Sequence, residues 1–201
     1  MLKKQQNAKK LAFLVMRKLI SLVWVVAAAT SAGDAPPSGS LARAHESLAM
    51  GNPGGIYREI EPLLGSLQQY AAADQAQLHY LMARAASFEN DDDRAIHHYA
   101  KYLRTKPAGS RKTAVLRALA DLYAERRDFH HAALIAERWV AELTDPTPQD
   151  LMWVQANHFY ARDYAGALKW LNLAIATASA RGEEVPDQWL EWRGGLQKEL
   201  E

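Results

Sequence analysis

The chain has 201 residues, of which 49% are hydrophobic and 23% are charged, with 11 Gly, 8 Pro and no Cys. This composition suits a folded globular protein, and it excludes wholesale disorder and collagen-like repeats. The lack of cysteine excludes disulfides, thiolate metal sites and a cysteine nucleophile.

Charge is unevenly distributed along the chain, although the whole sequence has a formal charge of only +1. Residues 1–32 contain six Lys or Arg residues and no acid, so residues 33–201 contain 18 basic and 23 acidic residues, a net charge of −5. Nucleic-acid binding needs a clustered basic face. The mildly acidic body therefore argues against nucleic acid as the main partner.

Residues 1–32 have the pattern of a secretory signal peptide. A Lys- and Arg-rich start leads into the apolar run 19–29, and small residues follow that run. This order of a basic, an apolar and a small-residue region is typical of export signals. Cleavage after Ala32 fits the peptidase's preference for small side chains, and cleavage after Ala29 is the alternative.

Both the translation start and the cleavage of this segment allow an alternative. Translation from Met16 would give a more compact signal, with residues 1–15 as an over-extended start. An uncleaved membrane anchor is the less favoured option, because the apolar run is short of the roughly 20 residues that cross a bilayer. After cleavage, residues 33–40 are predicted to be the flexible N-terminus of a periplasmic or secreted protein.

The sequence repeats itself at spacings of 37 and then 35 residues. Three columns carry the repeat: Asp91, Asp128 and Asp163; Ala95, Ala132 and Ala167; and Ile96, Ala133 and Leu168. An Asp at a helix start accepts hydrogen bonds from free backbone N–H groups, and an Ala column lets two antiparallel helices approach closely. The sequence therefore predicts helix–turn–helix units at about 76–107, 113–144 and 148–180.

This pattern resembles the tetratricopeptide repeat, in which small, aromatic and Pro residues recur at fixed offsets. The best match lies in the second unit, at Leu119, Ala120, Tyr123, Phe129 and Ala132. The third unit departs from the pattern, with Gln155 and His158 where a small residue and Tyr are usual. The resemblance implies an all-α fold, in which the units stack as a right-handed α-solenoid with one concave and one convex face.

Weaker patterns flank these three units. Residues 41–64 predict a fourth, degenerate pair of helices, in which Pro62 is expected to kink or shorten the second helix. Residues 187–200 predict a C-terminal capping helix, which an open stack of repeats requires. The whole solenoid is thus expected to span residues 41–201.

The sequence gives no positive support for an enzyme, and no catalytic residue, metal ligand or cofactor is predicted. Neighbouring side chains on a helix point in different directions, so neither His97–His98 nor His130–His131 chelates one ion from one face. Solvated or capping histidines are favoured. The acidic run 91–93 is explained as a helix N-cap followed by solvated residues.

Five tryptophans follow the N-terminal segment. Trp139 and Trp170 are predicted to pack in the core or between repeats. Trp153, Trp189 and Trp192 allow two interpretations: packing under the capping helix, or an exposed aromatic patch with Phe159 and Tyr160. Packing is favoured, because a terminal helix needs an apolar face to dock.

The first helix of each unit is expected to line the concave groove, and such grooves bind extended or helical peptides. The repeat frame places a mixture of aromatic and charged side chains there, which suits a polypeptide partner. The candidate peptide-binding residues are Gln77, Tyr80, Arg84, Phe88, Arg117, Asp121, Glu125, Met152, Phe159 and Tyr160.

The third unit and the tail, residues 161–192, are similar to periplasmic tetratricopeptide proteins encoded with TonB–ExbB–ExbD energy-transducing systems. This resemblance implies a non-enzymatic adaptor that assists TonB-dependent transport across the outer membrane, with TonB, ExbB or ExbD as partners. Membrane contact is expected only through the signal peptide. The alternative is an envelope-assembly scaffold for cell-wall or outer-membrane machinery.

Overall fold

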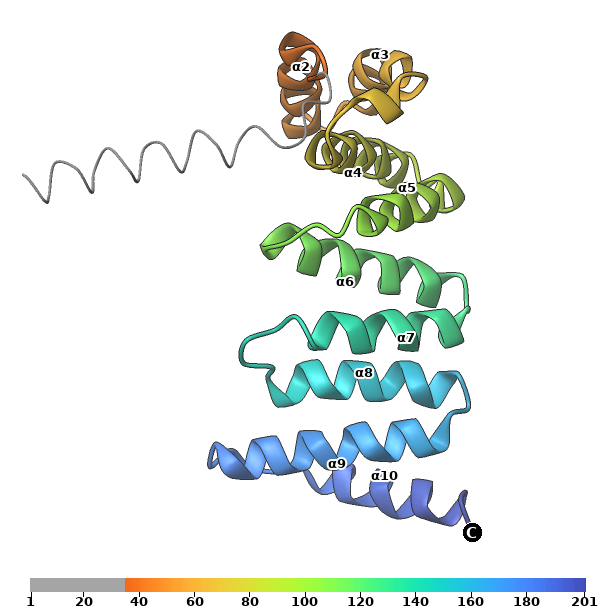
Figure 1. Cartoon of the computed structure of the whole chain (residues 1–201). Helices are drawn as coiled ribbons and strands as arrows, with labels where there is room; N and C mark the ends of the chain where they lie inside the picture. The colour runs from red at the N-terminus through yellow and green to blue at the C-terminus, as the bar shows by residue number, and fades with distance from the viewer. Residues whose placement is uncertain (1–34) are drawn as a thin grey trace, which may run out of the picture.

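The computed structural model describes residues 35–201, and all regular secondary structure in this range is helical (Figure 1). The elements are α2 (Ser38–Ala49), α3 (Pro53–Leu64), the short 3-10 helix η1 (Leu67–Gln69), α4 (Ala72–Phe88), α5 (Asp92–Arg104), α6 (Ser110–Glu125), α7 (Phe129–Val140), α8 (Pro148–Tyr160), α9 (Tyr164–Ala180) and α10 (Asp187–Lys198). Within 35–201, no helix is both long and apolar enough to span a bilayer. The signal-peptide prediction for residues 1–32 lies outside the described residues.

The helices form antiparallel pairs that stack one after another. The pairs are α2 with α3, α4 with α5, α6 with α7, and α8 with α9, and α10 packs on α9 at the C-terminal end. Figure 1 shows this stack running from α2 and α3 at the top to α10 at the bottom. The predicted all-α helical-repeat solenoid with a capping helix is therefore confirmed.

The N-terminal pair departs from the prediction in detail. Helix α2 begins at Ser38, so the last three residues of the segment 33–40, predicted to be a flexible N-terminus, belong to a helix. The backbone N–H of Ser40 donates to the carbonyl of Pro37, which starts the helix there. Helix α3 contains Pro62 in its last turn and ends two residues later, at Leu64.

The Asp column caps the second helix of each unit. The side chains of Asp91, Asp128 and Asp163 each accept a hydrogen bond from the backbone N–H three residues later, at 3.0–3.3 Å. The residues just before these aspartates, Asn90, Arg127 and Arg162, all have positive φ, between 57° and 60°. The same left-handed turn and Asp cap thus reverse the chain in all three units.

The Ala column brings paired helices together, and larger side chains fill the space between pairs. Ala95, Ala132 and Ala167 are all fully buried. A core cluster joins the second and third units through Trp139, Trp170 and their aliphatic neighbours Leu116, Leu151 and Val154. Further clusters lie at the N-terminal pair, between the first two units, and under α10. The apolar core therefore runs along the whole stack.

Candidate functional site on the first-helix face

The candidate peptide-binding residues lie on α4, α6 and α8, the first helices of the three units. We call the surface formed by α4, α6, α8 and α10 the first-helix face. None of the ten candidates is buried, and Phe88, Phe159 and Tyr160 are 42%, 46% and 62% exposed. Met152 and Tyr80 also pack against the core clusters, so these two have a structural role as well.

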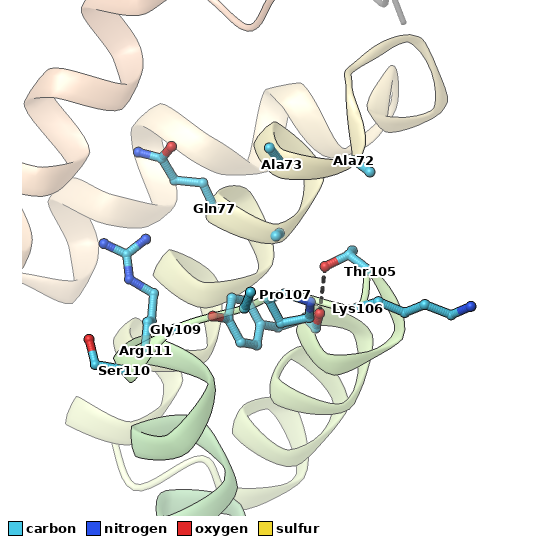
Figure 2. Close-up of a pocket in the computed structure, with 12 residues that line it drawn as sticks. Ala72, Ala73, Gln77, Thr105, Lys106, Pro107, Gly109, Ser110 and Arg111 are labelled. Atoms are coloured by element: carbon cyan, nitrogen blue, oxygen red, sulfur yellow. Dashed lines mark hydrogen bonds between the residues drawn. The ribbon is translucent and has the colours of Figure 1, made fainter. Parts of the chain in front are cut away.

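A hollow of about 550 Å³ with a mixed polar and apolar lining lies between α4 and the segment that joins α5 to α6 (Figure 2). Gln77 and Arg111 lie on one side of it, and the side chain of Lys106 extends away on the other. Within residues 35–201, neither Lys106 nor Arg111 forms an ion pair. The guanidinium of Arg111 instead lies 4.8 Å from the centre of the Tyr80 ring. This end of the first-helix face is therefore basic.

Gln77 contacts the N-terminal pair as well as the hollow. Its Nε2 lies 2.5 Å from Nε2 of His45 on α2. Partial burial, with a smaller contribution from Arg111, lowers the pKa of His45. The degenerate pair therefore contributes to this end of the site, which sequence reasoning did not anticipate.

Arg117 lies over two indole rings at the centre of the first-helix face. Its guanidinium carbon lies 3.7 Å from the ring centre of Trp153 and 4.9 Å from that of Trp139. Its Nε also lies 3.3 Å from the Asp121 carboxylate. Arg117 therefore links α6, α7 and α8, and it lines a second hollow of about 740 Å³ together with Trp139 and Glu142.

An apolar hollow of about 450 Å³ separates α8 from α10, and we call it the α8–α10 hollow. Its lining residues are Gln155, Ala156, Phe159, Tyr160, Glu191, Trp192, Gly195, Leu196 and Glu199. Further aromatic side chains lie next to this hollow. The ring centres of Tyr160 and Phe129 are 5.0 Å apart in a stacked arrangement, and those of Phe159 and Tyr164 are 6.0 Å apart.

Of the three tryptophans with two possible interpretations, two pack against the core and one is exposed. Trp153 and Trp189 pack against the core, as favoured. Trp192 does not pack under the cap: it is 43% exposed and lines the α8–α10 hollow, so the favoured prediction is wrong for this residue. The reason is helical geometry. Trp189 and Leu196 share the face of α10 that docks on α9, whereas Trp192 is turned towards α8.

The histidines are arranged differently from the sequence-based expectation. His98 is not solvated or capping, because it is buried and its Nδ1 lies 3.1 Å from Nδ1 of the equally buried His79 on α4. Burial lowers the pKa of His79 to about 4 and that of His98 to about 3, and the positive charge of Lys101 acts in the same direction. Both rings are therefore neutral near pH 7. In the described part of the chain, no group of three His, Asp or Glu side chains is placed to hold a metal ion.

His158 explains one departure of the third unit from the repeat pattern. Its buried ring lies 2.7 Å from Asp163 through Nδ1 and 3.3 Å from Glu137 through Nε2. Glu137 also accepts a hydrogen bond from the indole N–H of Trp170 at 2.9 Å. Hydrogen bonds from the Gly166 N–H and from His158 lower the pKa of Asp163. This network joins α7, α8 and α9 at the position where the second unit has Tyr123, whose ring stacks on His131.

The network leaves no room for a side chain at Gly166. Replacing Gly166 by Ala is therefore expected to lower the free energy of unfolding, whereas the same change at a glycine with open space around it is expected to raise it. A Cβ at Gly166 would overlap the Asp163 carboxylate and the His158 ring. We expect Gly166→Ala to lower the free energy of unfolding by about 1–3 kcal/mol. The matched variant Gly194→Ala, where a Cβ meets nothing within 4 Å, is expected to raise it by roughly 0.5–1 kcal/mol. Urea unfolding followed by circular dichroism measures both, and a gain for Gly166→Ala would contradict this account.

No family model and no curated protein matches the sequence. Among solved structures, PlcR from Bacillus thuringiensis in complex with the peptide PapR7 and DNA is similar over 81% of this chain and 62% of the PlcR chain, at 17% identity and a TM-score of 0.42. The alignment thus spans less than two thirds of PlcR. The helical pairs described above define the class: the chain is an all-α helical-repeat protein.

Proposed function

We propose that this chain is a non-enzymatic adaptor that binds a protein or peptide partner on its first-helix face. The observation that carries the proposal is the row of three hollows along this face, each lined by aromatic side chains next to charged ones. Aromatic and Arg side chains supply most of the binding energy at protein interfaces, and stacked helical pairs offer one continuous surface for them.

We place this adaptor in the periplasm and assign it a role in TonB-dependent transport. The export pattern of residues 1–32 supports the location, and the resemblance of residues 161–192 to TonB-associated repeat proteins supports the role. An envelope-assembly scaffold is the second candidate, because such a protein would also be exported and would bind protein partners on the same first-helix face. Sequencing the N-terminus of the protein from a periplasmic fraction tests the location, with Gly33 as the expected first residue.

Site-specific photo-crosslinking in intact cells tests the binding function. A crosslinking amino acid at Arg84 or Glu125 lies on the first-helix face, and one at Leu134 or Leu173 lies exposed on the second helices α7 and α9. We expect the first pair to capture one common partner and the second pair to capture none. Capture at all four positions, or at none, would contradict the proposal.

The identity of the captured partner separates the two candidate roles. TonB, ExbB or ExbD in the crosslinked product, with siderophore uptake reduced in a deletion strain, supports the transport adaptor. Cell-wall or outer-membrane assembly enzymes, with normal siderophore uptake, support the scaffold.

A further inference from the structure

The α8–α10 hollow differs from the other two hollows of the first-helix face in its apolar lining and its acidic edge. The geometry points to a socket for one large apolar side chain of a polypeptide that carries Lys or Arg on either side of it. This inference rests on the proposed peptide-binding function and assigns the chemistry of the partner at the C-terminal end of the face.

The apolar character comes from side chains that the fold leaves uncovered. Phe159 and Trp192 are 46% and 43% exposed, and the buried Leu196 lies between them and α9. Because α10 docks on α9, the space between α10 and α8 stays open. A hollow of about 450 Å³ falls within the range of specific ligand pockets, about 300–1,000 Å³. It therefore holds an aromatic or branched aliphatic side chain together with its backbone.

Gln155 favours a polypeptide as the occupant. It stands where the repeat pattern has a small residue, it is only 6% exposed, and it lines the hollow. A side-chain amide offers both hydrogen-bond donors and an acceptor, which match the N–H and C=O groups of a peptide backbone. A lipid chain offers no such partner. Gln155 thus adds a side chain that can hydrogen-bond to a peptide backbone to a wall that is otherwise apolar.

The charge around the hollow favours a basic sequence. Glu191, Gly195 and Glu199 follow one row along α10, so two carboxylates flank the open position left by the glycine. Among residues 35–201, neither Glu191 nor Glu199 forms an ion pair. The segment 183–201 as a whole contains six acidic and two basic residues. Complementary charge steers a partner and fixes its register. A partner with Lys or Arg next to its large apolar side chain therefore fits the acidic edge of the α8–α10 hollow.

Synthetic peptides test this chemistry directly on the full chain. Three short fluorescein-labelled peptides share one polar host sequence: the first has a central Trp with Lys on both sides, the second has the same Trp with Glu on both sides, and the third has Gly in place of Trp and keeps both Lys. Fluorescence anisotropy is expected to show that the first peptide binds at least about tenfold more tightly than the other two. Equal affinity for the Glu-flanked peptide would overturn the inference.

Two adjacent glycines of α10 provide a matched pair of blocking variants. A Cβ at Gly195 or at Gly194 meets no atom within 4 Å, so a side chain starts without a clash at either position, but only Gly195 lines the hollow. Gly195→Leu is expected to weaken binding of the Trp–Lys peptide at least about tenfold, and Gly194→Leu to leave it within about twofold. Unchanged binding by Gly195→Leu would overturn the inference.

Other outcomes distinguish this inference from the proposed function. If Arg84 and Glu125 still crosslink one partner while Gly195→Leu has no effect on peptide binding, the adaptor function stands and the socket is assigned wrongly. If no position on the first-helix face captures a partner, the adaptor function itself fails. If the chain dimerises and Gly195→Leu abolishes the dimer, the occupant is a second copy, which overturns the inference as well.

Discussion

Replacing Trp139 by Ala is expected to lower the free energy of unfolding by about 3–5 kcal/mol. The residue is 7% exposed and belongs to the core cluster that joins the second and third units. Its ring lies 5.1 Å from that of Trp153 in an edge-to-face arrangement, and Arg117 lies over it. The substitution thus leaves a cavity between repeats and removes one of the two indole rings that hold Arg117.

Trp192→Ala is the matched control, because it makes the same chemical change at an exposed position. Trp192 is 43% exposed, so its replacement is expected to cost less than about 1 kcal/mol. Urea unfolding curves from circular dichroism and from tryptophan fluorescence compare the two variants. Similar costs for both variants would show that Trp139 does not hold the repeats together. A repeat stack can also unfold in parts, so separate transitions for the two signals would locate the weakened interface.

The fold was predictable because the signals that specify it are local and recur. Asp91, Asp128 and Asp163 each cap a helix through a bond to a residue three positions later, so the sequence shows the cap without knowledge of the tertiary structure. The Ala column repeats with the same spacing, which indicates how paired helices approach. The helix starts at Ser38 and Ala72 were missed by a few residues because neither has a side-chain cap to mark it.

The site was predictable only in part, because its contacts join helices that are distant in sequence. Phe159 and Tyr160 are exposed, and the exposure of each follows from its position in one helix. The repeat frame did not reveal that Arg117 lies over both Trp139 and Trp153, because that arrangement depends on how three helices cross. It also misplaced Trp192, because the docking angle of a terminal helix has no repeating neighbour to define it.

The buried His79–His98 pair is expected to make the protein lose stability as the pH falls from about 6.5 towards 4. The folded state lowers the pKa of His79 from its ordinary value of 6.5 to about 4 and that of His98 to about 3, chiefly through burial. In the unfolded chain both imidazoles take up protons near pH 6.5, whereas in the folded chain they stay neutral. Their contribution to stability is therefore complete above pH 6.5 and is lost on acidification.

The expected loss between pH 7 and pH 5 is about 2–4 kcal/mol for the pair. Urea unfolding at a series of pH values measures it, and the double variant His79→Leu/His98→Leu is the control. His45 and His97 also have lowered pKa values and are present in both proteins, so the difference between the two proteins isolates the pair. We expect the wild-type curve to fall more steeply than that of the double variant over this window. Parallel curves would mean that the two rings are protonated as easily in the folded chain as in the unfolded one, and that their burial does not govern the response to acid.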